Sequence, residues 1–422
     1  MKIFLFCLAL LFCSFAKAQK INRIINAAEV ERIERVLASD SLRGRKVFTP
    51  DIEKAADFIS AEFKKARLKP LSGLKDYRQS FGMIRPKLIS IEASIDGKKL
   101  TKDDIVIVCT AEGLNITEQS GFEVKTIGAK DNFTASILQV RQSGKNMVVF
   151  LDTSFRKNFA RLSFLTRQML YDAPTAIYIL TSDVPKQFSV SLKQSLEKLP
   201  LTNIVGVLPG KTKPNEYVIF SGHYDHLGIG KPVNGDSIYN GANDDAAGTT
   251  AVILLAKYFK KMHNNARTLV FVAFTAEEIG EYGSQYFSKQ LNPPDVKAMF
   301  NIEMIGTESK WGKNSAYITG FDKTDMGKIL QDNLKGSVFS FYPDPYTTEN
   351  LFLRSDNASL ARVGVPAHTI STSKMDNEPN YHKPSDEIST LDMANMAEII
   401  KSIAISSGSI VSGKDTPTRV QQ

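Results

Sequence analysis

The sequence predicts an α/β fold with a mostly parallel central sheet flanked by helices, into which a β-rich module is inserted. After residue 200, the strand-like runs EYVIFSG, RTLVFVAFT and VKAMFNIEM alternate with the helical run DAAGTTAVILLAKYFKKM and with a second helix expected near 282–290. Continuous apolar strands that alternate with helices indicate parallel strands covered on both faces. From about 81 to 199, short apolar runs separated by polar turns indicate a separate unit.

The composition is that of a globular protein. Its 422 residues are 42% hydrophobic and 23% charged, which is enough to bury one or two large cores. The net charge of +8 falls to +6 when Lys2 and Lys17 are removed with a leader. No basic run is interleaved with aromatic residues, so nucleic acid is not indicated as a partner.

The first residues, MKIFLFCLALLFCSFAKAQK, predict a secretory signal at 1–18. An early lysine precedes a short apolar stretch, and the segment ends in the small-x-small pattern Ala16-Lys17-Ala18. The apolar stretch is too short for a stable membrane span, so we expect a periplasmic or secreted protein. Lipid attachment at Cys13 is the alternative, which the bulky Phe12 before it disfavours. Cleavage would leave Cys109 as the single cysteine and permit no internal disulfide.

Four further regions follow the leader. Residues 19–80 predict leading helices, with apolar positions such as Ile52 and Ile59 on one face behind a cap at Thr49 or Asp51. The inserted module at 81–199 contains runs such as DIVIVC, NMVVFLD and TAIYIL, and one amphipathic helix expected within 158–170. The main domain spans 200–412, and the polar tail 413–422 is expected to fray.

Acidic and imidazole side chains follow the predicted strands of the main domain. Because ligands bind outside the carboxyl ends of the strands in open α/β sheets, these residues are expected to meet at one edge. Carboxylates mixed with imidazoles suit zinc better than calcium, which prefers oxygen ligands only. The residues are His223 and Asp225 in GHYDHLG, Asp244 and Asp245 in NGANDDAAG, Glu277 and Glu278 in TAEEIG, Glu303 in FNIEMIG, and His382 and Asp386 in NYHKPSDEIS.

Each motif alone also has an ordinary explanation. NDDAAG could cap a helix, the glutamate pair could favour a solvated first helical turn, and His382 could be a loop histidine. The joint occurrence of these motifs at successive strand ends predicts a metal site. His226 is interpreted as a neighbour of that site and not as a ligand, and His368 is left undecided.

The ordered motifs GHYDH, GANDDAAG, AEEIGEYGS, NIEMIG and YHKPSD resemble those of the M28 family of zinc exopeptidases, the co-catalytic aminopeptidases. The resemblance covers about residues 200–410, and residues 40–79 resemble the leading helices of the family. The inserted module lies where many relatives carry a protease-associated domain. The resemblance implies that 200–412 form a catalytic metallopeptidase domain that binds Zn²⁺, two ions per chain.

Carried over by position, the resemblance implies a role for each strand-end residue. His223 would bind one metal ion, Asp244 would bridge both, and Glu278 and His382 would bind the other. Glu303 stands where the family usually has Asp, and we expect it to coordinate the ion of His223 in an altered and weaker geometry.

The remaining site residues would surround these ligands. Asp225 and Asp386 are expected to fix imidazole tautomers. Neighbouring residues that leave a strand point in different directions, so Glu277 is expected to face the metal-bound water as general base while Glu278 binds the metal. Tyr381 is a candidate hydroxyl donor to the substrate, and a packing aromatic is an equal alternative.

The leading hypothesis is an exported zinc metallo-aminopeptidase that hydrolyses N-terminal residues from peptides through a metal-activated water. A glutaminyl cyclase of the same fold is the first alternative. A catalytically inactive binding domain is the second, and the competent side chain at every ligand position disfavours it.

Overall fold

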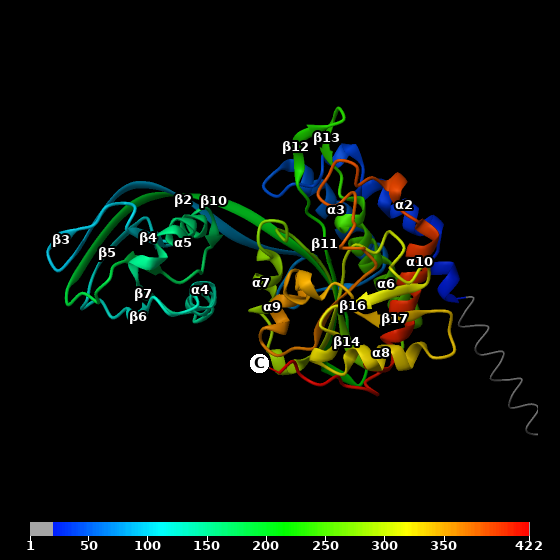
Figure 1. Cartoon of the computed structure of the whole chain (residues 1–422). Coiled ribbons are helices and arrows are strands. Elements are labelled where there is room, and N and C mark those ends of the chain that lie inside the picture. Colours follow the sequence, from blue (N-terminus) through cyan, green and yellow to red (C-terminus); the bar gives the residue numbers. More distant parts are fainter. Residues whose placement is uncertain (1–19, 422) are drawn as a thin grey trace, which may run out of the picture. The chain divides into compact units, whose positions relative to one another are not determined.

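The computed structural model describes residues 20–421, so the expected signal segment at 1–18 lies outside the described residues. The chain divides into two units (Figure 1). The larger unit contains the described residues before 81 and after 200, and the smaller one is Phe81–Pro200. The chain passes between them within the strands β2 (Arg78–Ile95) and β10 (Phe188–Leu208).

A mixed sheet forms the centre of the larger unit. Its strands lie in the order β17-β16-β18-β15-β11-β14-β10. The inner strands β18, β15, β11 and β14 are parallel to one another, whereas β10 and β16 run antiparallel to their inner neighbours. The bounds are β11 (Lys213–His223), β14 (Arg267–Phe274), β15 (Val296–Ile302), β16 (Ser315–Ile318), β17 (Ser340–Pro343) and β18 (Ala367–Ser371), with the short β1 (Lys69–Pro70) beside β10.

Helices cover both faces of this sheet, so every side chain of the inner strand β14 is buried. On one face Phe220, Phe271 and Phe300 stack across three strands, with ring centroids 5.6 and 4.9 Å apart, under Phe259 of α6 (Ala247–Met262). On the other face, the core takes in Phe287 of α7 (Tyr282–Ser288) and Leu360 of α9 (Asn357–Ala361). The expected α/β class with a mostly parallel sheet is confirmed.

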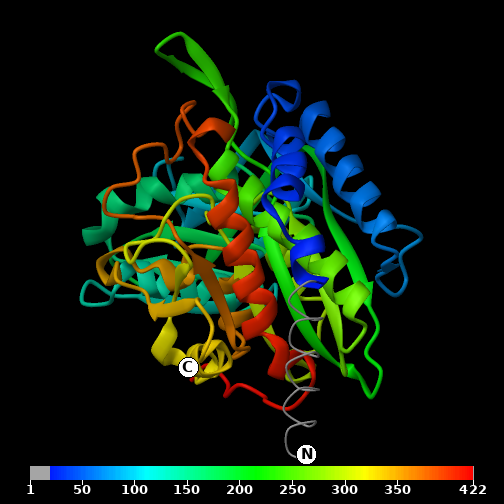
Figure 2. The same cartoon turned by 90° about the vertical axis from the view of Figure 1, so that its right-hand side faces the viewer.

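The remaining helices of the larger unit are α2 (Ala27–Leu37), α3 (Pro50–Lys65), α8 (Met326–Leu334), α10 (Met393–Ser406) and α11 (Gly408–Val411). Thr49 occupies the cap position of α3, but its hydroxyl donates to the Lys46 carbonyl and makes no capping bond. A hairpin of β12 (Gly228–Val233) and β13 (Asp236–Tyr239) projects from the unit (Figure 2). No helix within residues 20–421 combines the length and apolar character needed to cross a bilayer.

The expectation of a frayed tail is wrong for the described part of it. The Thr418 amide donates to Asp325, and the Arg419 guanidinium donates to the Val296 carbonyl at 2.8 Å. The Val420 amide donates to the Gly364 carbonyl at 3.1 Å. Polar residues at a chain end dock where they meet complementary main-chain groups.

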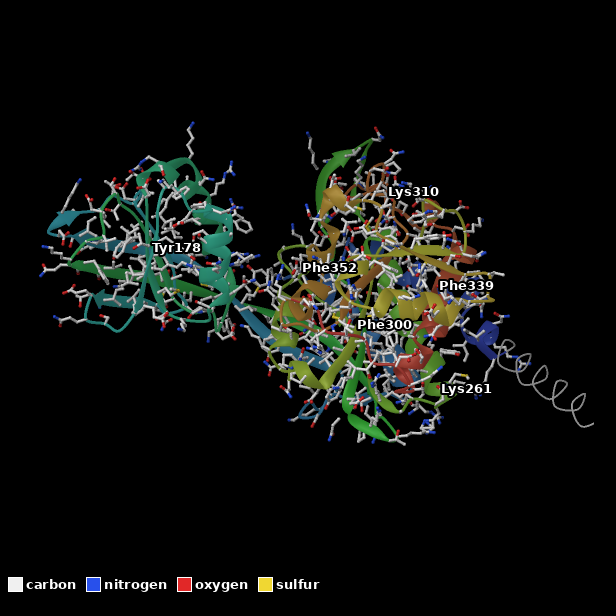
Figure 3. All side chains as sticks on the ribbon, turned by 60° about the horizontal axis from the view of Figure 1, so that its bottom comes forward. Tyr178, Lys261, Phe300, Lys310, Phe339 and Phe352 are labelled. Carbon is white, nitrogen blue, oxygen red and sulfur yellow. The ribbon has the colours of Figure 1, made fainter. Side chains whose placement is uncertain are left out.

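The smaller unit combines strands and helices around the sheet β4-β9-β7-β6. Tyr178, which is fully buried in it, and Phe300 in the larger unit mark the two cores (Figure 3). The helix expected within 158–170 is present as a 3₁₀-helix at Ala160–Thr166 that directly follows the short α5 (Arg156–Phe159), and the Ser163 and Thr166 hydroxyls in it donate to main-chain carbonyls three residues earlier. The elements are β3 (Lys98–Lys99), β4 (Ile105–Val108), β5 (Gly113–Thr117), β6 (Glu123–Ile127), α4 (Phe133–Gln142), β7 (Met147–Leu151), α5 (Arg156–Phe159), β8 (Met169–Leu170) and β9 (Ala176–Leu180).

Candidate metal centre

The carboxyl ends of β11, β14 and β15 meet at one edge of the sheet. His223 is the last residue of β11 and pairs in register with Phe274 of β14. Glu277 follows β14 by three positions, and Glu303 directly follows β15. The parallel order therefore brings together residues far apart in the sequence, as the strand-end argument anticipates.

Asp244 lies at the centre of this cluster. It is buried in the irregular turn Ala242–Ala246, immediately before α6. One of its carboxylate oxygens lies 3.1 Å from His223 Nε2, and the other lies 3.2 Å from His382 Nε2. Burial acts to raise the pKa of Asp244, but its close contacts with both imidazoles outweigh it and lower that pKa well below its usual value. A carboxylate shared in this way can bridge two cations.

A second carboxylate lies beside His382. Glu278 Oε2 is 3.1 Å from His382 Nε2, while Glu278 Oε1 is 2.6 Å from His226 Nδ1. Burial alone would lower the pKa of His382, but its contacts with Asp244 and Glu278 raise that pKa to about 10. His226, which the sequence analysis interprets as a neighbour, thus brings a ring nitrogen within 4.8 Å of ligand atoms of Asp244 and Glu278.

Glu303 completes a group on the opposite side of Asp244. Ligand atoms of Glu303, His223 and Asp244 lie within 4.8 Å of one another. Burial is the largest influence on the Glu303 carboxyl group and raises its pKa. The Asn301 side-chain amide donates to Glu303 Oε2 at 3.5 Å.

Glu277 turns away from Glu278 toward His223. Its Oε2 atom lies 3.9 Å from His223 Nε2, and its side chain is 12% exposed. Burial raises the pKa of Glu277 well above its usual value, against the opposing effect of His223. The main-chain amides of Glu277 and Glu278 donate to the two carboxylate oxygens of Asp225, at 3.1 and 3.4 Å.

Asp225 and Asp386 orient main chain more directly than they orient imidazole rings. The nearest acceptor to His223 Nδ1 is the Asp225 carbonyl at 3.1 Å, whereas the Asp225 carboxylate is 3.8 Å away. Asp386 accepts the amides of Asn243 and Asp244 at 2.8 and 3.0 Å. At both positions the carboxylate lies closer to main-chain amides than to a ring nitrogen. The sequence motifs alone do not show which of these partners the carboxylate contacts.

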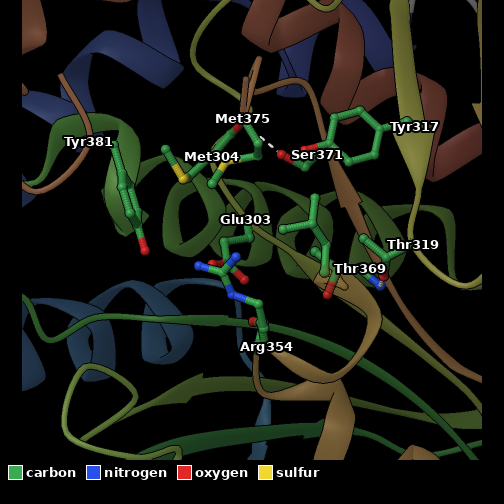
Figure 4. Close-up of a pocket in the computed structure, with 11 residues that line it drawn as sticks. Glu303, Met304, Tyr317, Thr319, Arg354, Thr369, Ser371, Met375 and Tyr381 are labelled. Atoms are coloured by element: carbon green, nitrogen blue, oxygen red, sulfur yellow. Dashed lines mark hydrogen bonds between the residues drawn. The ribbon is translucent and has the colours of Figure 1, made fainter. Parts of the chain in front are cut away.

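A pocket opens beside Glu303 (Figure 4). Its lining includes Met304, Arg354, Ser371 and Tyr381. The Tyr381 ring stacks on the His382 imidazole with centroids 3.9 Å apart, so it both packs and borders the pocket. His368 lies apart from this cluster: it is fully buried, its Nδ1 and Nε2 atoms contact Thr319 and Thr324, and burial lowers its pKa to about 4.

Several buried atoms of the cluster have no hydrogen-bond partner within the described part of the chain. They are His223 Nε2, His226 Nδ1 and Nε2, and Glu278 Oε1. The 2.6 Å approach of His226 to Glu278 therefore lacks hydrogen-bond geometry. Buried polar groups are normally satisfied. Imidazole and carboxylate atoms that converge without bonding one another have the chemistry of a divalent-cation site.

Comparisons of the sequence match this chain to one peptidase family and to zinc peptidases and aminopeptidases. Residues 203–405 match the model described as peptidase family M28. A probable zinc metalloprotease of Pyrenophora teres f. teres is 32% identical over 26% of this chain and 23% of its own length. Leucine aminopeptidase 1 of Coccidioides posadasii is 28% identical over 46% of this chain and 52% of its own length. The chain therefore spans about a quarter to a half of these curated relatives.

Solved structures extend the likeness of fold. An aminopeptidase from Aneurinibacillus sp. strain AM-1 superposes with a TM-score of 0.55 at 16% identity, covering 93% of this chain and 95% of that chain. Glutaminyl cyclase of Porphyromonas gingivalis gives 0.51 at 12% identity, covering 92% and 99%. Within residues 203–405, a little under half of its length, the chain is similar to peptidase family M28.

Proposed function

We propose that this protein is an exported zinc-dependent aminopeptidase that removes N-terminal residues from peptides. The observation that carries the proposal is the Asp244 carboxylate, whose two oxygens face the ring nitrogens of His223 and His382 at 3.1 and 3.2 Å. The family match and the names of the zinc metalloprotease and leucine aminopeptidase relatives support the same activity.

Two zinc ions fit the donor atoms. The donors form two sets that share Asp244: His223 and Glu303 on one side, and Glu278 and His382, with His226 as a further donor, on the other. The mixture of nitrogen and oxygen donors favours zinc, and the orphaned ring nitrogens of this cluster are atoms that a cation would satisfy.

The side chains around the donors would carry out the proton transfers. Bound zinc supplies a Lewis acid that lowers the pKa of water and polarises a carbonyl group. Glu277 is close enough to His223 to accept a proton from water at the centre and return it to the leaving amine. The Tyr381 hydroxyl borders the pocket that contains Glu303, where it can donate to the carbonyl oxygen of the scissile peptide.

The substrate would be a peptide with a free amino terminus. The pocket beside Glu303, whose lining includes Met304 and Met375, offers space next to the donor atoms for the side chain of the first residue. Export rests on the leading segment 1–18 with its apolar run and Ala16-Lys17-Ala18 ending. Mass spectrometry of exported protein should find a chain that begins at or near Gln19; a chain that begins at a lipidated Cys13 would contradict soluble export.

A metal-dependent release assay tests the activity. Protein stripped by a chelator should release no amino acid from a panel of aminoacyl and peptidyl substrates, and added zinc should restore release. Acetylated versions of the same peptides should resist, because they lack the free amine. Release that is unaffected by chelation, or equal cleavage of the acetylated peptides, would contradict the proposal.

A glutaminyl cyclase is a second candidate, because the fold also resembles that of the Porphyromonas gingivalis enzyme. The two donor sets that share Asp244 favour a two-ion hydrolase over it. A peptide that begins with Gln separates the two activities. We expect a peptide shortened by one residue, whereas a pyroglutamyl peptide of unchanged length would favour the cyclase.

A further inference from the structure

Arg45 is a fully buried arginine next to the metal centre. It follows the short turn Asp40–Leu42 in the run SLRGR, which contributes no donor atom to the metal centre. Burying a guanidinium is costly unless all of its donors are used. The contacts of Arg45 therefore indicate why a cation is kept at this position.

The guanidinium donates to main-chain carbonyls on both loops that carry metal donors. Arg45 Nε donates to the Tyr224 carbonyl at 2.8 Å, within the loop between His223 and His226. Arg45 Nη1 donates to the Asn240 carbonyl at 2.5 Å, and Nη2 donates to the Gly241 carbonyl at 2.9 Å. Nη1 also donates to the Leu37 carbonyl at 2.6 Å, which ties the group to α2. One rigid fork thus spans two loops.

The main chain around Arg45 reinforces this link. The His226 amide donates to the Arg45 carbonyl at 3.3 Å, and the Gly228 amide donates to the Gly44 carbonyl at 3.0 Å. Gly44 has a φ of 71°, and a Cβ atom there would lie 2.3 Å from the Tyr239 carbonyl oxygen. Glycine is needed for this close approach, so the segment before Arg45 is fitted against the same loops.

The charge of Arg45 also suits the acidic centre. Four buried carboxyl groups act electrostatically on it: Glu34, Asp386, Asp225 and Asp244. Glu34 itself is held by the Thr250 hydroxyl at 2.6 Å. A planar guanidinium can reach several carbonyls at once, whereas a lysine ammonium is a single point of contact.

We propose that Arg45 is a positioning residue that holds the loops of His223 and Asp244 at the separation needed to bind zinc. The inference rests on the proposed metal centre and deepens it. Arg45 comes from the leading helical region, yet it would align metal donors that lie about 180 to 200 positions later in the chain. Outer-shell partners of metal ligands commonly change metal affinity or activity by about 10–100-fold.

The test compares Arg45→Met and Arg45→Lys with a matched control, Arg267→Met. Arg267 is also fully buried and also donates to main-chain carbonyls, those of Ile410 and Asp415, but at the start of β14. Zinc affinity is measured by chelator competition on metal-free protein, and the melting temperature is measured with chelator present. Both arginine-to-methionine variants should melt earlier than the unaltered protein.

Zinc affinity should separate the variants. Arg45→Met should weaken it by about 10–100-fold, Arg45→Lys by less, and Arg267→Met should leave it unchanged. If Arg45→Met does not fold, amide hydrogen exchange of Arg45→Lys should be faster at 224–228 and 240–246 in the metal-free state. Unchanged zinc affinity in Arg45→Met, equal weakening in Arg267→Met, or unchanged exchange in Arg45→Lys would overturn the proposal. Weakened zinc binding in a protein that cleaves no peptide would sink the aminopeptidase proposal and leave this one standing.

Discussion

The two ends of the central sheet both bury charged groups, but they satisfy them differently. At the amino end, Arg267 begins β14, and its Nε lies 2.6 Å from Glu216. Its other nitrogens donate to the Ile410 and Asp415 carbonyls and to Thr416. At the carboxyl end, imidazoles and carboxylates gather without enough partners, and ring nitrogens of His223 and His226 lack hydrogen bonds within the described residues.

This difference separates a structural network from a binding site. A buried ion pair whose partners are all present keeps its own charge balance. A buried acidic cluster whose ring nitrogens and carboxylate oxygens lack hydrogen-bond partners needs cations to complete it. Each ionised carboxylate there also makes ionisation of the next carboxyl group less favourable. We therefore propose that the carboxyl end binds two zinc ions and that Asp244 joins them.

Removing the bridge should have the largest effect. Asp244→Ala takes a shared ligand from both ions, and two close cations repel each other more strongly without it. We expect loss of both metals and of all activity, whereas His223→Ala should retain one ion. Elemental analysis measures the content, and two ions still bound to Asp244→Ala would show that the carboxylate is not a bridge.

Glu277→Gln should have the second largest effect. Activity should fall by about 10²–10⁴-fold or more while the metal stays bound. The amide has the same shape but cannot accept a proton. Steady-state kinetics and elemental analysis on one preparation measure both quantities. Near-normal turnover would remove the role assigned to Glu277.

Glu303→Ala should affect one ion only. A zinc titration of stripped protein should show two phases, because the longer Glu303 side chain meets its ion in an altered geometry. The variant should lose the weaker phase and keep the tighter one. Glu308→Ala, which alters a half-exposed acid five positions later, is the control and should keep both phases. Two intact phases in Glu303→Ala would contradict its coordination.

His226→Ala tests whether the unexpected histidine is a ligand. If its ring nitrogen completes the set of Glu278 and His382, the tighter phase should weaken by about 10-fold or more, the range known for removal of groups around a metal. If zinc binding is unchanged, His226 is only a neighbour of the site, as the sequence interpretation has it.

The smallest effect, a change in the pH dependence of stability, is expected at Glu62, a buried carboxylate of α3 whose cationic partners are all present. Burial acts to raise its pKa, but hydrogen bonds from Lys257, Lys65 and Arg32 outweigh it and lower the pKa to about 2. Because this pKa is lower in the folded state, the stabilisation is present above about pH 4.5 and is lost as the pH falls toward 2. Chemical unfolding should show that Glu62→Gln is less sensitive than the unaltered protein to pH in this window. An identical acid dependence would contradict the pairing.

The sequence predicts the sheet and the strand-end residues because both follow from simple periodicity. The apolar runs of β11, β14 and β15 end at or just before His223, Glu277 and Glu303, which are residues of the site. Contacts between segments far apart in the sequence leave no periodic pattern, so the sequence alone does not predict the features that depend on them. The ring of His226, the amide partners of Asp386 and the docking of Thr418 on Asp325 all depend on loop paths that the fold decides.

Anomalous diffraction at the zinc absorption edge, from crystals of zinc-loaded protein, is the most direct test of whether Asp244 joins two zinc ions. We expect two peaks that share Asp244. One should lie within coordination distance of His223 and Glu303, and the other within coordination distance of Glu278 and His382. A single peak, or peaks with Asp244 bound to only one of them, would contradict the claim that this carboxylate joins two zinc ions.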